Sequence, residues 1–344
     1  MKDIFLFIIV SFSLINQFII SKESNGFNSY SKLLEYIRAD IIDKALLTLP
    51  KRAQSDILKM SIEMNKLKES YLLNDAESAF LVYKWITQNI IYDCKGDEKS
   101  EYASNVFNTG MGISSGIADL FKTMANLLHI ETNSINGIVK YQKNDINNLM
   151  QEIEYVWNSI LINDTYYLVD VSMGSGTCNI NTFQKTYSDF YFGTNPEFFI
   201  YSHFPKDSKW QLLSNNISYS QFSSMASLID SFFKYGFKAI SPNTNTFIVD
   251  AKAYIGLSYD ESLIPPNLRV GGITFDGNME ILDLLSYTKS KGKIEISFLM
   301  NKQKLRYLIV SVEKSPNNFI GIALYKVNNS IRKNNLRKNQ KKKI

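Results

Sequence analysis

The stretch that decides the fold lies between residues 109 and 176. It reads Thr-Gly-Met-Gly-Ile-Ser-Ser-Gly-Ile-Ala-Asp-Leu-Phe (109–121), then Glu-Tyr-Val-Trp-Asn-Ser-Ile (154–160), then Tyr-Tyr-Leu-Val-Asp-Val-Ser-Met-Gly-Ser-Gly (166–176). The pattern predicts a glycine-rich turn, an apolar helix over 114–130, and strands that return towards the start of that helix. This order is typical of a thiol acyl-transfer site, with a nucleophile at a helix N-terminus, a base on one strand and a carboxylate on the next.

These segments resemble the transglutaminase-like superfamily, and most closely its kyphoscoliosis-peptidase branch. In that family they usually read Gly-Val-Cys-Ser-Gly-Tyr-Ala-x-Leu-Phe, His-Ala-Trp-Asn and Tyr-Leu-Val-Asp-x-Thr-Trp-Gly. Ser114 stands at the position of the family's Cys nucleophile, Tyr155 at that of its His, and Asp170 matches its Asp. Flanking stretches at 83–93 and 194–213 also match, so the resemblance covers about residues 75–240.

The resemblance implies a degenerate catalytic triad at Ser114, Tyr155 and Asp170. A thiolate is accessible near neutral pH because a free thiol titrates at about 8.5, whereas a serine hydroxyl needs a positioned base. Tyr155, with an unperturbed pKa of about 10, is protonated at pH 7 and is a poor acceptor. Loss of both nucleophile and base predicts loss of acyl-transfer activity.

Each of these residues also has a structural interpretation. Ser114, just before an apolar helix, is a good N-cap, Tyr155 is a typical packed aromatic residue, and Asp170 can bind backbone amides or Tyr155. Of the two histidines, His129 lies fifteen residues beyond Ser114, about 22 Å along a helix, and His203 belongs to a Ser-His-Phe-Pro motif. Neither is a convincing base from sequence, although a fold can bring His203 closer.

The residues around the triad positions are retained, namely Gly112, Gly116, Trp157 and Asn158, and we expect them to support the cleft. The predicted fold class is α+β: a papain-like domain of transglutaminase type, preceded by helices and followed by a β-sandwich-like domain. The polar segment from Gln142 to Ile153 is predicted to be a loop.

Composition shifts divide the chain into five parts. Residues 1–24 hold an apolar run typical of a signal peptide, so we expect a secreted protein, with an uncleaved anchor as the alternative. A helical segment follows over 25–75, then the transglutaminase-like domain over 76–240. Strand-like segments separated by turn signals predict the β-sandwich over 241–328, and residues 329–344 form a basic tail.

The net charge resides in that tail. It supplies seven of the 38 basic residues with no acid, so the rest of the chain carries 31 basic and 33 acidic residues, a balance of −2. A solvated end is the simplest interpretation, and a weak contact with an anionic surface is the alternative. Specific nucleic-acid binding is not predicted, because the tail has no interleaved aromatic residues. A metal site is not predicted, because the chain has only two cysteines, and no cofactor is predicted.

Cys94 and Cys178 are candidates for a disulfide in a secreted protein, but their separation along the chain leaves pairing open. Glycosylation acceptors occur at Asn163, Asn216 and Asn328 if the host is a eukaryote.

Three functional hypotheses follow from the sequence. The leading one is a secreted pseudoenzyme whose cleft binds a protein or peptide without acyl transfer. The second is an active peptidase-like hydrolase or acyltransferase that uses Ser114 with an unexpected base such as His203. The third is an adhesion or assembly module that acts through the C-terminal β-domain.

Overall fold

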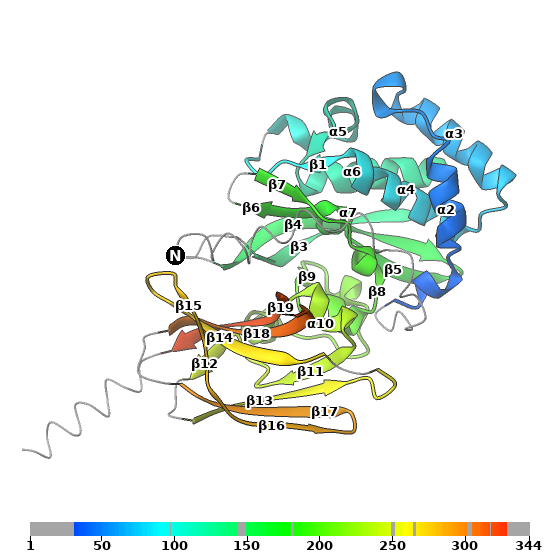
Figure 1. Cartoon of the computed structure of the whole chain (residues 1–344). Helices are drawn as coiled ribbons and strands as arrows, with labels where there is room; N and C mark the ends of the chain where they lie inside the picture. The colour runs from blue at the N-terminus through cyan, green and yellow to red at the C-terminus, as the bar shows by residue number, and fades with distance from the viewer. Residues whose placement is uncertain are drawn as a thin grey trace, which may run out of the picture. The chain divides into compact units, whose positions relative to one another are not determined.

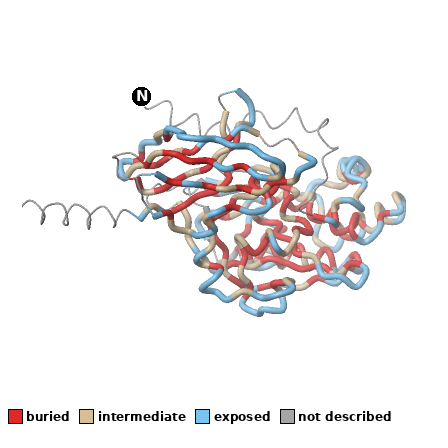
Figure 2. The backbone as a smooth tube through the Cα atoms, turned by 90° about the horizontal axis from the view of Figure 1, so that it is seen from below, coloured by how far each residue is buried: buried red, intermediate tan, exposed pale blue. Residues whose placement is uncertain are grey.

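A computed structural model describes residues 31–96, 98–142, 149–179, 182–248, 252–263, 266–300, 305–316 and 318–328. The chain forms two compact units, Met1–Asn216 and Ile217–Ile344 (Figure 1). The expected signal peptide (1–24) and basic tail (329–344) lie outside the described residues. Buried residues run through the helices and strands of each unit, as Figure 2 shows in red.

The division between the units falls before the boundary near residue 240 that the sequence predicts. The intervening segment forms α9 (Tyr219–Ser224), β10 (Ser227–Leu228), α10 (Asp230–Lys234) and β11 (Phe237–Ser241). Strand β10 pairs with the last strand of the second unit, β19 (Asn318–Asn328), and β11 pairs with β13 (Lys252–Tyr259). Backbone pairing therefore assigns this segment to the second unit.

The helical segment at 31–75 is part of the first unit. Its buried residues Leu33, Ile42, Met60 and Met64 share one hydrophobic cluster with the helices that follow. The α-helices of this unit are α2 (Ala39–Leu46), α3 (Ile57–Ser70), α4 (Asp75–Asn89), α5 (Ala103–Thr109), α6 (Ser114–Leu127), α7 (Val171–Ser175) and α8 (Pro196–Phe199). The helix predicted over 114–130 is confirmed as α6, which ends at Leu127.

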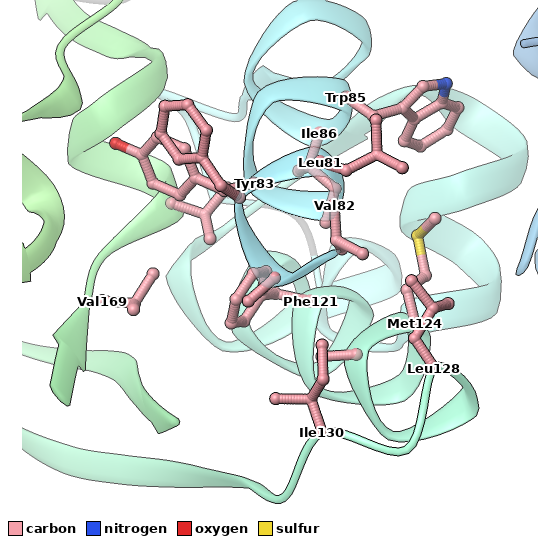
Figure 3. Close-up of a cluster of buried hydrophobic side chains, with 14 of the residues drawn as sticks. Leu81, Val82, Tyr83, Trp85, Ile86, Phe121, Met124, Leu128, Ile130 and Val169 are labelled. Carbon is pink, nitrogen blue, oxygen red and sulfur yellow. The ribbon is translucent and has the colours of Figure 1, made fainter. Parts of the chain in front are cut away.

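Helices α4 and α6 form the centre of the first unit's core. Asn74 and Glu77 start α4 with a reciprocal capping box, in which each side chain accepts from the other's backbone N–H. Tyr83 and Trp85 of α4 and Phe121 and Met124 of α6 belong to one cluster of buried side chains (Figure 3). This packing fixes the N-terminus of α6, where the candidate site begins.

A five-stranded antiparallel sheet completes the first unit in the order β8-β5-β4-β3-β9. Its strands are β3 (Thr132–Gln142), β4 (Met150–Ile162), β5 (Thr165–Val169), β8 (Phe192–Thr194) and β9 (His203–Pro205). Asn163 and Asp164, with φ of 48° and 59°, form the tight turn between β4 and β5 that the sequence predicts. The prediction of a loop over 142–153 is wrong at both ends, because Gln142 belongs to β3 and residues 150–153 belong to β4.

Two small strand pairs complete the first unit near the site. Strand β1 (Ile91–Tyr92) runs parallel to β2 (Met111–Gly112), and β6 (Gly176–Asn179) pairs with β7 (Thr182–Lys185). Short 3-10 helices connect the larger elements: η1 (Leu33–Tyr36), η2 (Arg52–Gln54), η3 (Glu98–Glu101), η4 (Asp189–Tyr191) and η5 (Ser208–Gln211).

The second unit contains two sheets, as expected for a β-sandwich-like domain. One has the order β10-β19-β18-β14-β15 with β12 paired to β19, and the other has the order β11-β13-β17-β16. The strands not yet given are β12 (Thr246–Ile248), β14 (Leu268–Thr274), β15 (Met279–Ile281), β16 (Leu284–Ser290), β17 (Lys293–Leu299) and β18 (Leu305–Ser315). Phe247 of the first sheet lies 6.0 Å from Phe298 of the second, ring centre to ring centre.

Of the helices that the structure describes, none has both the length and the apolar character needed to cross a bilayer.

Candidate functional site

Ser114 is the first residue of α6, and the prediction that it caps this helix is wrong. Ile113 occupies the N-cap position, where its backbone N–H donates to the carbonyl of Ser100. The Ser114 hydroxyl instead accepts from the backbone N–H of Val156 on β4 at 3.4 Å and lies beside the phenol of Tyr92. The strand pair β1–β2 sets where the helix begins, because it holds Gly112 in an extended strand just before Ile113 and Ser114.

The two glycines beside Ser114 allow a close approach of the preceding segment. A Cβ atom on Gly116 would lie 2.0 Å from the carbonyl oxygen of Ser100, and one on Gly112 would lie 2.6 Å from the Val106 side chain. Both positions therefore need glycine for packing rather than for an unusual backbone angle. The glycines support the site by letting η3 and α5 lie against the start of α6.

Tyr155 is a buried aromatic residue on β4, with 4% of its surface exposed. Its ring stacks on that of Tyr92 with centres 6.4 Å apart, and its hydroxyl lies near Ser172. Burial, with a smaller contribution from the negative charge of Asp170, raises the pKa of the Tyr155 phenol well above its usual value. The phenol therefore stays protonated at neutral pH and is not a general base.

Asp170 directly follows β5, caps α7 and interacts with His203, which the sequence suggested only as a base for Ser114. One carboxyl oxygen caps α7 by accepting from the backbone N–H of Met173 at 3.0 Å. The other lies 3.0 Å from Nε2 of His203, and both side chains are almost completely buried. No hydrogen bond joins Asp170 to Tyr155 in the described part of the chain, so only the backbone alternative for Asp170 holds.

His203 is held on both sides of its ring. Its Nδ1 lies 2.7 Å from the Ser202 hydroxyl, and the ring stacks on Phe199 with centres 3.8 Å apart. Burial lowers the pKa of this imidazole, and the hydrogen bond to Asp170 only partly offsets that effect. The ring is therefore neutral at pH 7, with Nε2–H donating to Asp170 and Nδ1 accepting from Ser202.

The sequence signal for the Asp170–His203 pair is the Ser-His-Phe-Pro motif, which places a histidine at the start of β9. Sequence spacing alone does not reveal the partner, because 33 residues separate Asp170 from His203. Since Asp170 and Ser202 occupy both ring nitrogens, neither nitrogen binds the Ser114 hydroxyl. The structure thus brings Ser114, Tyr155 and Asp170 into one region but connects each of them to a different partner.

Trp157 and Asn158 fix β4 in this region. The Asn158 side-chain amide donates to the carbonyl of Ala118 on α6 at 3.1 Å and to that of Asn133 on β3 at 3.3 Å. Trp157 packs beside Phe199 and His203, with ring centres 6.1 Å and 5.1 Å away. These contacts hold the strand against the helix that carries Ser114.

A disulfide closes the same region. Cys94, two residues after the end of β1, is bonded to Cys178 of β6, which answers a question that the sequence left open. The Cys178 backbone N–H also donates to the hydroxyl of Tyr141 at 3.1 Å. Tyr92, Cys94, Tyr141, Tyr155 and Cys178 share one hydrophobic cluster. The disulfide therefore links the strand that carries Tyr92 to β6 inside the site.

The described residues contain no group of three or more His, Cys, Asp or Glu side chains placed to hold a metal ion.

Comparison with known proteins gives the class. A sequence model of the transglutaminase-like superfamily matches residues 65–171. Residues 65–171 therefore form a transglutaminase-like domain, as the resemblance implies.

The chain is also similar to kyphoscoliosis peptidase. The Mus musculus protein is 29% identical over 233 residues, covering 65% of this chain and 34% of the peptidase, and the Homo sapiens protein is 29% identical over 232 residues, covering 64% and 34%. The Lim and transglutaminase domain protein ltd-1 of Caenorhabditis elegans is 24% identical over 235 residues, covering 61% of this chain and 31% of that protein. The chain spans about a third of the length of these relatives.

Proposed function

We propose that the transglutaminase-like domain is a pseudoenzyme that binds a protein or peptide without acyl transfer. One observation carries the proposal: in the described part of the chain, the Ser114 hydroxyl accepts from the Val156 amide and lies beside the Tyr92 phenol, and no hydrogen bond joins it to a group able to take its proton. A serine attacks only if a base removes that proton during the reaction.

The neighbouring titratable groups do not supply a base. The raised pKa of Tyr155 keeps its phenol protonated. His203 is neutral, but Asp170 and Ser202 use both of its nitrogens. The alternative of a serine hydrolase with His203 as base therefore lacks the hydrogen bond on which its chemistry depends.

The support for a binding role is the intact framework around the altered positions. Asn158 still connects β4 to α6, and the glycines still admit the segment before the helix. Such a framework can present a stable surface to a partner although its reactive groups differ.

We further propose that the protein is secreted. The support is the disulfide between Cys94 and Cys178, because such bonds persist mainly in oxidising compartments. Immunoblotting of medium and cell fractions tests this part independently of activity, and retention of the protein inside cells contradicts it.

The decisive experiment restores the residues that the family carries. Wild type, Ser114→Ala and the double variant Ser114→Cys with Tyr155→His are purified and assayed for amine incorporation into, and hydrolysis of, a mixed peptide pool. We expect wild type and Ser114→Ala to be equally inactive. Turnover by wild type that Ser114→Ala abolishes would falsify the proposal.

A matched control separates a restored site from a merely reactive thiol. Ser115 is the next residue of the helix, so Ser115→Cys with Tyr155→His places the thiol one position away. Turnover by the Ser114 double variant but not by this control shows that the framework still accepts a substrate. Binding itself is measured by capture of the same peptide pool on wild-type protein, and absence of any retained peptide removes the binding half of the proposal.

A further inference from the structure

The two sheets of the second unit end on neighbouring strands. Strand β15 (Met279–Ile281) is the last strand of one sheet, and β16 (Leu284–Ser290) is the last strand of the other. Only Leu282 and Asp283 separate them: the Leu282 N–H donates to Val270 of the first sheet, and the Leu299 N–H of the second sheet donates to Asp283. The edges of both sheets therefore adjoin on one side of the unit (Figure 1).

Strand β16 is exposed over its whole length. All seven of its residues are exposed, whereas its neighbour β17 has buried residues at Ile294, Ile296 and Phe298. Apolar side chains are concentrated on this edge: Ile281 is 68% exposed, Leu285 47%, Leu284 40% and Tyr287 36%. Single exposed apolar residues are ordinary, but a continuous set on an edge strand marks a site of association.

The backbone of β16 also has capacity for a further strand. Among the described strands it pairs only with β17, in regular antiparallel register from Ser286 to Ser290. In an antiparallel strand, alternate residues direct their N–H and C=O groups away from the existing partner. The bulge between Leu284 and Ser286 precedes this regular part and leaves it uninterrupted. A second extended strand can therefore hydrogen-bond to the outer side of β16.

Charge along this edge identifies the strand that fits. Acidic residues occupy its first part and basic residues its last part: Glu280 and Asp283, then Lys289 and Lys291, of which Lys291 also pairs with Glu261 of its own chain at 3.2 Å. An antiparallel copy of the same strand places the basic end of each chain beside the acidic end of the other. A parallel copy would place like charges together, which is destabilising across strands.

We propose that this protein forms a homodimer in which β16 pairs antiparallel with β16 of a second copy. The two four-stranded sheets then join into one eight-stranded sheet across a two-fold axis, and the apolar residues of the two edges meet beside it. A two-fold interface uses the same surface on both chains, which the self-complementary charge pattern fits. The dimer leaves the transglutaminase-like domain of each chain unchanged, so this proposal does not depend on the absence of catalysis.

The test measures the mass of the full chain in solution by sedimentation velocity over a range of concentrations. We expect a species of twice the 39.5 kDa of one chain. Tyr287→Lys should weaken association by about tenfold or more, because the substitution acts twice in a two-fold interface and places a charge among the apolar residues that meet there. The matched control is Tyr254→Lys, since Tyr254 is 60% exposed but lies on β13, an interior strand of the same sheet.

Charge exchange tests the orientation. Asp283→Lys and Lys289→Glu should each weaken the dimer, and the double variant should recover much of the loss because the two ends exchange signs in both chains. Near-wild-type thermal unfolding of each variant excludes misfolding as the cause.

A chain that remains monomeric at about 100 μM overturns the proposal, since its affinity is then too weak for a stable dimer. A dimer that Tyr287→Lys does not weaken also overturns the proposal and assigns association to another surface. If the double charge variant loses as much affinity as the two single variants together, the antiparallel orientation is wrong. Hydrogen exchange supplies a second readout: amides of β16 should gain protection as the concentration rises.

Discussion

Asp170 offers the sharpest test of how the candidate site is held together. Its two carboxyl oxygens bind the Met173 amide, which starts α7, and Nε2 of His203 on β9. Replacing Asp170 by Ala removes both acceptors at once. Because the His203 side chain has no exposed surface, water does not replace the lost partner of its Nε2–H.

The magnitude follows from these two contacts. Loss of a side-chain helix cap costs about 1 kcal/mol. A buried donor left without a partner costs about 1–3 kcal/mol. We therefore expect Asp170→Ala to reduce the free energy of unfolding of the first unit by about 2–4 kcal/mol.

Asp170→Asn should be much milder because both partners can adjust. The amide oxygen can still accept from Met173, and the amide NH₂ can donate to Nε2 of His203 if the imidazole proton moves to Nδ1 and is donated to Ser202. We expect a loss below about 1 kcal/mol. ¹⁵N NMR of the ring should show Nε2–H in wild type and Nδ1–H in Asp170→Asn.

Urea unfolding monitored by tryptophan fluorescence is the assay. All three tryptophans, Trp85, Trp157 and Trp210, belong to the first unit, so the signal reports its unfolding alone. With a urea dependence of about 2 kcal/mol per M, Asp170→Ala should lower the midpoint by about 1–2 M.

Asp207 provides the matched control. It caps η5 through the Lys209 backbone N–H at 3.1 Å, and both Asp207 and the Lys209 side chain with which it forms an ion pair are exposed. Asp207→Ala should cost only the capping contribution of about 1 kcal/mol or less. If Asp170→Ala costs no more than this control, the buried contact with His203 does not stabilise the fold and the reasoning is refuted.

Three further predictions concern the same unit. Burial lowers the pKa of His203 although Asp170 opposes this effect, so the unfolded chain binds a proton more readily than the folded chain. The free energy of unfolding is therefore at its full value above about pH 6.5 and decreases as the pH falls below it. His203→Gln should reduce that decrease in urea titrations between about pH 5 and 7. Replacing Cys94 and Cys178 by Ser opens a connection that spans 84 positions and should cost about 2–5 kcal/mol, measured by the same fluorescence midpoint. Gly137→Ala would place a Cβ atom 2.2 Å from the Trp157 ring, which should cost about 1–3 kcal/mol and shift the tryptophan emission.

Each of these predictions has a contrary outcome. An unchanged pH profile in His203→Gln, set against an exposed-histidine control such as His129→Gln, would show that another group controls the acid response. Equal stability of wild type with and without reductant would contradict the disulfide contribution. For the glycine, Gly256→Ala is the control because its nearest contact would be 3.9 Å away, and equal thermal shifts in both variants would mean that the Trp157 contact relaxes without cost.

The sequence predicted the central helix, the β4–β5 turn and the β-rich second unit because each follows from a local pattern. Apolar spacing after Ser114 specifies a helix, and Asn163-Asp164 tolerates the left-handed backbone of a tight turn. The domain boundary near 240 differed from the structure because β10 and β11 are short, and only their pairing with β19 and β13 assigns them to the second unit.

The residue types at the candidate site were determined by the sequence alone: a serine, a tyrosine and an aspartate where the resemblance implies a Cys-His-Asp triad. Their connections were decided only by tertiary structure. Asp170 binds His203, Ser114 meets Tyr92, and Cys94 reaches Cys178 because the packing of helices, sheet and hairpin brings together residues that are distant in the sequence. Local patterns encode helices, turns and exposed faces, whereas hydrogen bonds across such separations depend on the packing of the whole unit.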